Sequence, residues 1–241
     1  MIQITDLSQI ACGDCLEIMQ EMPSASVDAI VTDPPYMLQI RSDGVGALSP
    51  WGDLMNSAYW YAEMLRQFKR LLRPEGACLV FTNWRGLPTL MKAGYMADLP
   101  IKGVLTWSNQ WPGTGHFFRT SSELLCLFVG EKFKMRNRCL LDVQYFPPVP
   151  TAKRLHSAEK PVELLRFAID NISNDAEHDT VFDPFMGSGS TGVAAEMEGR
   201  RFIGIELDER FYDAARKRIE EVGKQQSILQ YTGQSQEGIA R

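Results

Sequence analysis

One short motif of this sequence combines a carboxylate, two prolines and an aromatic ring. Asp33-Pro34-Pro35-Tyr36 directly follows the apolar run Val27–Thr32, which its composition predicts to be a strand. The prolines fix the backbone and remove two N–H donors, so the carboxylate and the ring would stand on a rigid rim. Because open α/β sheets bind ligands beyond the carboxyl ends of their strands, the motif is a candidate site. A surface turn also fits these four residues taken alone.

A second motif joins a predicted strand to a predicted helix through glycines. Asp183–Gly189 reads Asp-Pro-Phe-Met-Gly-Ser-Gly and precedes a predicted helix over Gly192–Glu198. The next predicted strand ends at Glu206, about twenty residues beyond the turn, a spacing that holds a ribose-bearing cofactor with an acid on its hydroxyls. The turn is shorter than a dinucleotide motif and contains no basic residue for a pyrophosphate. It favours a nucleoside cofactor over NAD.

The two motifs lie in an alternation of strand-like and helix-like segments, which predicts an α/β sheet with helices on both faces. Helical periodicity marks residues 59–72, 161–172 and 209–222, and Pro74-Glu75-Gly76 is expected to end the first helix. A polar tail from Lys224 onward is expected to fray. Strands are predicted at 9–12, 27–32, 77–82, 103–107, 124–129, 180–182 and 201–206.

Length and composition predict one compact globular domain, because 44% of the 241 residues are hydrophobic and 23% are charged. Cys12 and Cys15 are the only closely spaced cysteines, so no metal site is predicted, and reduced thiols suit a cytoplasmic protein. No apolar run has the length needed to span a membrane. With a net charge of −5, any nucleic acid must be bound by local basic patches.

Together the two motifs resemble those of the DNA amino-methyltransferases. Asp33-Pro34-Pro35-Tyr36 resembles the catalytic motif of that family, and Asp183–Gly189 resembles its cofactor-binding F-x-G-x-G motif. The likeness covers residues 9 to 222, and three further segments agree with it, at 12–17, 72–76 and 156–161. Because the catalytic motif precedes the cofactor motif, the order is similar to that of the permuted group called beta.

The resemblance implies an α/β, Rossmann-like fold of S-adenosylmethionine-dependent methyltransferases, with a mostly parallel seven-stranded sheet between helices. The permuted order would place the strand of residues 9–12 beside that of 202–206. We expect a methyltransferase domain at 1–223 with a short target-recognition insert at 131–155, and a flexible polar tail at 224–241. A homodimer is also expected, since many similar enzymes pair.

The resemblance further implies transfer of a methyl group from S-adenosylmethionine to an exocyclic amine of a DNA base. Asp33 and the carbonyl of Pro34 would accept the two amine hydrogens, within the rigid frame that Pro35 completes. Tyr36 would stack on a base that is flipped out of the duplex. The sequence contains no Pro-Cys pair, which argues against methylation at carbon 5 of cytosine.

An aspartate at position 33 resembles the members of the family that modify adenine. A serine there would resemble those that modify the 4-amino group of cytosine, so N6-adenine is the expected acceptor and N4-cytosine the alternative. A methyltransferase of RNA or of protein glutamine, or a non-catalytic DNA-binding relative, also remains open.

The same likeness supplies the expected cofactor contacts. Asp14 would face the adenine of S-adenosylmethionine, while Cys12 and Cys15 would pack at a strand end and a helix start. The full expected set is Asp14, His156, Lys160, Asp183, Phe185, Gly187, Ser188, Gly189, Thr191 and Glu206.

Basic residues alternate with Phe133 and Met135 over residues 132–138. On a strand this alternation puts the cations on one face and the apolar side chains on the other, which suits a ribbon facing phosphates. An ordinary charged edge strand is the structural alternative. The expected DNA contacts are Lys132, Lys134, Arg136, Arg138, His116 and Arg119.

Overall fold

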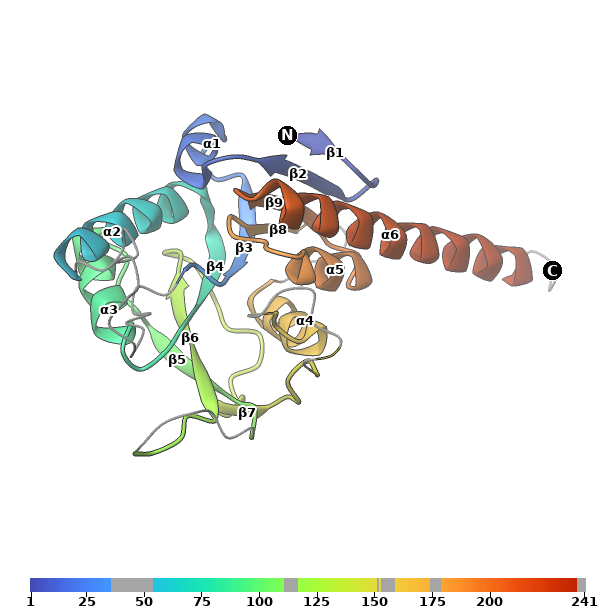
Figure 1. Cartoon of the computed structure of the whole chain (residues 1–241). Helices are drawn as coiled ribbons and strands as arrows, with labels where there is room; N and C mark the ends of the chain where they lie inside the picture. Colours follow the sequence, from blue (N-terminus) through green and yellow to red (C-terminus); the bar gives the residue numbers. More distant parts are fainter. Residues whose placement is uncertain (36–53, 111–116, 151, 153–158, 174–178, 238–241) are drawn as a thin grey trace.

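The computed structural model describes residues 1–35, 54–110, 117–150, 152, 159–173 and 179–237 (Figure 1). Strands in these ranges form one nine-stranded sheet of order β1-β2-β9-β8-β3-β4-β6-β5-β7. Their bounds are β1 Ile2–Gln3, β2 Ser8–Cys12, β3 Val27–Thr32, β4 Leu72–Thr82, β5 Gly103–Ser108, β6 Ser122–Val129, β7 Val143–Tyr145, β8 Thr180–Asp183 and β9 Arg201–Glu206.

The seven predicted strands are confirmed, but the expectation of a seven-stranded sheet is wrong. Within the described ranges, β1 and β7 add a short strand at each edge of the sheet. Strands of two and three residues are too short to carry a periodic pattern, so they were not predicted.

The permuted strand order is also confirmed. β2 pairs in parallel with β9, with Cys12 opposite Glu206, although the two strands lie far apart in the sequence. β8 runs parallel to β9 and β3, and β4 runs parallel to β3. The carboxyl ends of these five strands therefore share one edge, here called the carboxyl edge, and the other is the amino edge.

β6 reverses direction and is antiparallel to both β4 and β5. The start of β6, Ser122, lies opposite the last residue of β5, Ser108, so the β5–β6 connection lies on the carboxyl-edge side. The end of β6, Val129, lies opposite Ala77 near the start of β4, so the chain leaves β6 at the amino edge.

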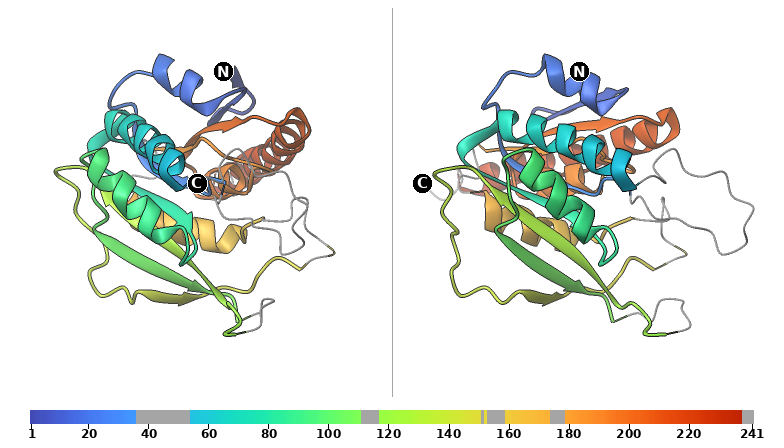
Figure 2. Two further views of the ribbon diagram at one scale, coloured as in Figure 1. Left: turned by 60° about the vertical axis from the view of Figure 1, so that its left-hand side comes forward. Right: turned by 90° about the vertical axis from the view of Figure 1, so that its left-hand side faces the viewer.

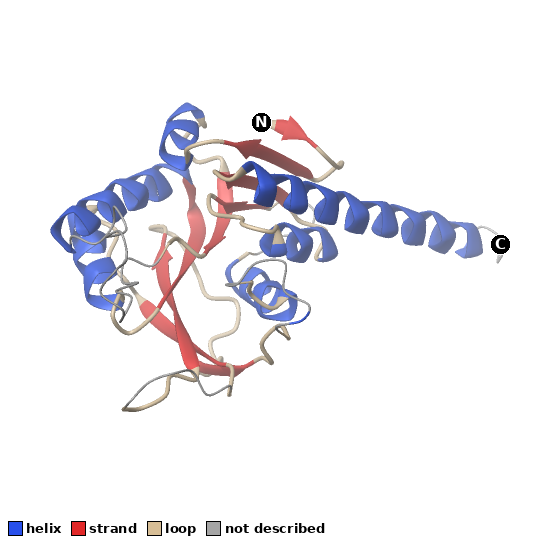
Figure 3. Cartoon of the chain, in the orientation of Figure 1, coloured by secondary structure: helices blue, strands red, loops and turns tan. Residues whose placement is uncertain are grey.

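Helices cover both faces of the sheet (Figures 1 to 3). α1 (Cys15–Glu21), α2 (Leu54–Leu71) and α3 (Leu87–Met96) pack on one face, in a core that contains Met19, Phe68 and Leu90. α4 (Val162–Ile172), α5 (Ser190–Met197) and α6 (Glu209–Glu237) pack on the other face. Two separate cores thus sandwich the sheet, as the α/β pattern predicts.

The amphipathic prediction for α2 is confirmed, because Tyr61, Leu65 and Phe68 are buried. The helix also ends before Pro74-Glu75-Gly76, as expected. α2 ends at Leu71 and β4 begins at the next residue, so Pro74-Glu75-Gly76 belongs to a strand. Proline is tolerated there because this part of β4 precedes its continuous pairing with β6, which starts at Ala77.

α6 continues to Glu237 and projects from the body of the protein (Figure 1). The backbone from Lys224 to Glu237 is helical, and the expected fraying of this tail stays a prediction. Lysine, glutamine and glutamate are good helix formers even without an apolar face. Like the other described helices, α6 is not long and apolar enough to cross a membrane.

Candidate active site

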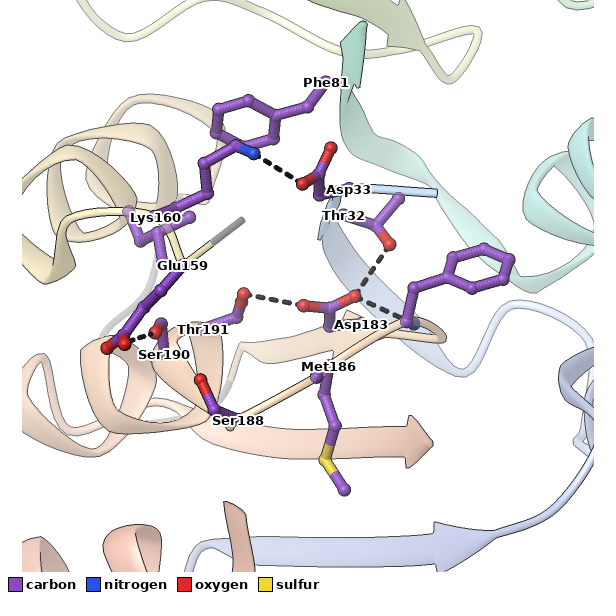
Figure 4. A pocket seen from close by; sticks show the side chains of 13 residues that line it. Thr32, Asp33, Phe81, Glu159, Lys160, Asp183, Met186, Ser188, Ser190 and Thr191 are labelled. Carbon is purple, nitrogen blue, oxygen red and sulfur yellow. Dashed lines mark hydrogen bonds and ion pairs between the residues drawn. The ribbon is translucent and has the colours of Figure 1, made fainter. Parts of the chain in front are cut away.

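A hollow opens at the carboxyl edge between the ends of β3 and β8, which pair in parallel. It encloses about 470 Å³, including space open to solvent. Asp33 directly follows β3 and Asp183 ends β8, so the two predicted motifs meet here. The lining residues, shown in Figure 4, are Thr32, Asp33, Phe81, Glu159, Lys160, Leu165, Asp183, Phe185, Met186, Gly187, Ser188, Ser190 and Thr191.

Asp33 is bound by a buried lysine. Lys160 Nζ lies 2.5 Å from Asp33 Oδ2 (Figure 4). The same Nζ lies 3.2 Å from Glu123 Oε2. Burial by itself lowers the pKa of Lys160, but the carboxylates of Asp33 and Glu123 outweigh burial and hold that pKa above its ordinary value. Lys160 is therefore a cation, and it fixes one oxygen of Asp33.

The second oxygen of Asp33, Oδ1, is buried and has no hydrogen-bond partner within the described ranges. A buried acceptor without a donor costs about 1–3 kcal/mol, so such an atom beside a hollow indicates a donor that arrives with a ligand. The neighbouring Pro34 is buried and offers no N–H group. The hydroxyl of Tyr61 donates to the Pro35 carbonyl at 3.0 Å, which ties the motif to α2.

Asp183 joins three elements beneath the hollow. Its Oδ1 accepts from the Thr32 hydroxyl at 2.7 Å and from the Phe185 N–H at 3.0 Å, and its Oδ2 accepts from the Thr191 hydroxyl at 2.6 Å. Burial raises the pKa of Asp183 to about 6, against the lowering effect of these hydrogen bonds. Asp183 therefore supports the turn from below.

Gly187 and Gly189 shape the turn between β8 and α5. Their φ angles are +51° and +82°, which glycine adopts without strain. A Cβ on Gly189 would lie 2.9 Å from Ala215, whereas the space around Gly187 is open. Glu206 accepts the N–H groups of Gly187 and Asp208, each at 2.9 Å, and each of its oxygens keeps a second lone pair. This open turn with an acidic rim fits the ribose of a nucleoside cofactor.

Asp14 lies beside this rim. The N–H of Gly13 donates to the Glu206 carbonyl at 2.9 Å, which holds the start of α1 against the end of β9. Asp14 Oδ1 accepts the N–H groups of Leu16 and Glu17 at 2.8 and 3.2 Å, so Asp14 is the N-cap of α1. The predicted adenine contact is thus placed next to the predicted ribose contact.

The two closely spaced cysteines occupy the implied positions, with Cys12 at the end of β2 and Cys15 at the start of α1. Burial raises the pKa of the Cys15 thiol to about 12, which keeps it protonated at neutral pH. Over the described ranges, no three His, Cys, Asp or Glu side chains are grouped so that they could hold a metal ion.

The remaining expected cofactor residues lie partly at the glycine turn and partly beside Asp33. The ring of Phe185 packs 5.8 Å from that of Trp60, and Ser188 is buried in the turn. Lys160 lines the same hollow and binds Asp33, and its expected contact with the cofactor stays a prediction. Three expected site residues, Tyr36, His116 and His156, lie outside the described residues.

The expected strand over residues 132–138 is wrong. After β6 the chain turns at Gly130, whose N–H donates to the Gly76 carbonyl at 2.9 Å, and residues 132–138 form turns and irregular backbone. They pair with no neighbouring strand, and β7 occupies the free edge of β5. Phe133 does point inward, against the core under α4, as expected.

This basic segment lies at the amino edge, on the far side of the sheet from Asp33. The N–H of Lys132 donates to the Pro74 carbonyl at 2.9 Å. Arg136 pairs with Asp170, near the end of α4, at 3.2 Å. Lys134 and Arg138 are exposed in the same segment.

Exposed aromatic and basic side chains occur instead on the carboxyl-edge side. Phe117 and Phe118 are 94% and 100% exposed, Arg119 is also exposed, and all three precede β6. Beyond the end of β4, Trp84 is 62% exposed, and the guanidinium of Arg85 lies 5.1 Å from the centre of its ring.

Several residues in or beside the hollow are not indicated by the sequence as site residues. Glu123 binds Lys160, and Glu159 pairs with Arg218 of α6 at 2.8 Å. Thr32 binds Asp183 from the preceding strand. Glu159 stands beside Lys160 in a motif that the resemblance had marked, whereas nothing in the spacing of Glu123 or Arg218 indicates a site.

A family profile described as DNA methylase matches residues 27–217 of this chain. The protein YubD of Escherichia coli strain K12, named as a methylase, is 29% identical over 213 residues, which cover 88% of this chain and 90% of that one. The type II methyltransferase M.HinfI of Haemophilus influenzae is 28% identical over 254 residues, covering 90% of this chain and 69% of that protein.

Solved structures show the same architecture. The crystal structure of an M1.HpyAVI–SAM complex is 26% identical, with a TM-score of 0.69 over 88% of this chain and 99% of that one. The PvuII DNA methyltransferase, named as cytosine-N4-specific, is 17% identical, with a TM-score of 0.71 over 91% of this chain and 92% of that one. The second likeness speaks for the fold alone.

Proposed function

Because this chain belongs to the DNA methylase family of N4 and N6 amino-methyltransferases, we propose that it methylates the 6-amino group of adenine in DNA. The chain is an S-adenosylmethionine-dependent DNA amino-methyltransferase, and the choice of adenine is the step proposed here. The choice of adenine rests on the aspartate at position 33, which resembles the adenine-modifying members of the family. The amine chemistry itself rests on the carboxylate of Asp33, with one oxygen bound to Lys160 and the other buried without a donor among the described residues.

The chemistry explains why such an oxygen is needed. S-adenosylmethionine supplies a methyl group on a positively charged sulfur, which is already strongly electrophilic. The exocyclic amine is a poor nucleophile because its lone pair is delocalised into the ring. Asp33 Oδ1 and the Pro34 carbonyl accept hydrogen bonds from the two amine hydrogens. These hydrogen bonds localise the lone pair on nitrogen. An aspartate oxygen and a backbone carbonyl are both acceptors, and they match an amine that presents two donors.

Residues on the two sides of the glycine turn would bind different parts of the cofactor. Glu206 offers its remaining lone pairs to the ribose hydroxyls, and Asp14 stands beside it for the adenine. Gly187 leaves open space at the turn, so that the cofactor backbone can approach. Asp33 and Gly187 line one hollow, so Asp33 would face the methyl-bearing end of a cofactor held at this turn.

We propose that DNA binds on the carboxyl-edge side, through Phe117, Phe118 and Arg119. The target base must reach Asp33, which follows β3 at this edge, and the basic segment 132–138 lies at the other edge. Exposed aromatic rings can stack on bases or fill the space that a flipped base leaves, and Arg119 can bind phosphate.

The acceptor is tested by methylating DNA with the purified protein and labelled cofactor, then identifying the modified nucleoside by mass spectrometry. N6-methyladenine is the expected product. N4-methylcytosine would show that the carboxylate does not select adenine. Labelled RNA in a parallel reaction tests the RNA alternative, and no transfer to any substrate would favour the non-catalytic one.

A further inference from the structure

Lys160 brings together three elements that are far apart in the sequence. It precedes α4, and its ammonium reaches Asp33 after β3 and Glu123 near the start of β6. The side chain is only 8% exposed, and its Nζ lies 5.1 Å from the centre of the Phe81 ring. A buried ammonium between two carboxylates is a costly arrangement unless each charge has a function or a partner.

The two oxygens of Asp33 differ in their contacts. Oδ2 is bound by Lys160 at 2.5 Å, and Oδ1 has no donor within the described ranges. A carboxylate held at only one oxygen by a flexible lysine would still turn about its terminal bond. Glu123 removes part of that freedom, because its carboxylate binds the same ammonium at 3.2 Å.

We propose that Lys160, anchored by Glu123, is a positioning residue that fixes the orientation of the Asp33 carboxylate. Only Oδ1 of Asp33 is then left to accept a hydrogen bond from the amine. The inference rests on the proposed function. Burial lowers the pKa of Lys160, but the two carboxylates raise it by more than burial lowers it. Lys160 therefore keeps its positive charge. Lys160 then acts on the reaction through Asp33, without touching the base or the cofactor.

Lys160→Met tests this role, with Lys69→Met as the matched control. Lys69 also lies 2.6 Å from an aspartate, Asp98, but on the exposed surface. We expect Lys160→Met to lower kcat about 100-fold, with the dissociation constant of S-adenosylmethionine changed less than about threefold. Lys69→Met should match the wild type in both. A loss of cofactor affinity that accounts for the lost rate would overturn the proposal and make Lys160 a cofactor ligand.

Glu123 supplies a second and milder test. Glu123→Gln keeps an acceptor for the ammonium and should lower kcat less than about threefold, whereas Glu123→Ala removes the anchor and should lower it about tenfold. Lys160→Arg should recover part of the rate lost in Lys160→Met, because it restores a cation beside Asp33. Equal rates for the Ala, Gln and wild-type proteins would refute the anchoring role.

If Lys160→Met does not fold, the double variant Lys160→Met/Glu123→Gln removes one of the two facing carboxylates and serves in its place. Crystal structures of the Lys160 and Lys69 variants measure the proposal without turnover. The carboxylate of Asp33 should change orientation only when Lys160 is replaced, and an unchanged Asp33 would overturn the inference. A wild-type protein without methyl transfer would instead count against the proposed function.

Discussion

Three acidic side chains at the carboxyl edge have different environments and therefore different roles. Asp183 has both oxygens occupied by groups of the protein, so it serves the fold. Glu206 accepts two backbone N–H groups and keeps lone pairs for a ligand. Among the described residues, no donor reaches the second oxygen of Asp33. The number of unused acceptor sites therefore supports a structural role for Asp183 and the proposed cofactor-binding and catalytic roles of Glu206 and Asp33, although all three residues follow or end a strand.

Glu206→Ala should weaken the binding of S-adenosylmethionine by roughly 1.5–3 kcal/mol, because a charge-assisted hydrogen bond to the ribose is lost. Calorimetric titration of the cofactor measures this change. Glu209→Ala is the control, since Glu209 is an exposed acid in the first turn of α6. Equal affinity in the Glu206 variant and the wild type would remove Glu206 from the cofactor site.

Asp183 should make stability depend on pH in a defined direction. Burial raises its pKa to about 6 from an ordinary value of 3.8, so between these values the folded protein binds the proton more tightly than the unfolded chain. The contribution of Asp183 to the free energy of unfolding therefore falls as pH rises from 3.8 to about 6, by up to roughly 3 kcal/mol.

Asp183→Asn cannot titrate, so its stability curve should lack this fall. Urea unfolding of both proteins at several pH values between 4 and 7 gives the difference in free energy of unfolding, using the slopes on denaturant. Parallel curves for the two proteins would mean that Asp183 carries the same charge, folded or unfolded, throughout this range.

At the level of elements, substitutions in the β5–β6 connection and in the segment after β6 should affect DNA binding differently. Replacing Phe117, Phe118 and Arg119 together by Ala should weaken DNA binding at least about tenfold and reduce the log–log salt slope by about 0.9 for the lost phosphate contact. Replacing Lys132, Lys134, Arg136 and Arg138 by Gln should change affinity and slope little, because they lie at the amino edge.

Fluorescence anisotropy with a labelled duplex at several salt concentrations measures both variants. Cofactor affinity should be the same in each, since neither change touches Asp14, Gly187 or Glu206. If the quadruple variant is the one that loses affinity, the duplex binds across the amino edge, and the carboxyl-edge surface proposed here is wrong.

The elements that sequence could predict are those with a periodic pattern or a motif. The seven longer strands and the pairing of β2 with β9 follow from apolar runs and from the order of the motifs. α1, β1 and β7 are too short for such patterns. α3 is longer, at ten residues, and nothing in the sequence analysis singled it out. The alternation of basic and apolar residues over 132–138 does not produce a strand, because a segment forms a strand only where a neighbouring strand can pair with it.

The same limit applies to the site. Asp33, Gly187 and Glu206 stand at strand ends and in a glycine turn, where local sequence indicates them. The link from Glu123 through Lys160 to Asp33 spans three elements and has no spacing that a single sequence would reveal. Lys160 was therefore expected at the cofactor, although its partner is the catalytic motif.

For the whole molecule, the permuted order brings the catalytic and cofactor motifs to the same edge of one sheet. Helices cover both faces, so this edge is where a base, a cofactor and Asp33 can meet (Figure 2). The chain as a whole is acidic, with a net charge of −5, so DNA must be attracted locally. All of these features point to Oδ1 of Asp33, which no donor reaches in the part of the chain that the structure describes.

The most direct test is the rate of methyl transfer to adenine in a single turnover, compared between the wild type and Asp33→Ala. We predict that the variant loses at least about 10³-fold in rate, because the acceptor that localises the amine lone pair is gone. Its circular dichroism and its affinities for S-adenosylmethionine and DNA should stay within a few-fold of the wild type. Near-normal transfer to adenine by Asp33→Ala would contradict the account.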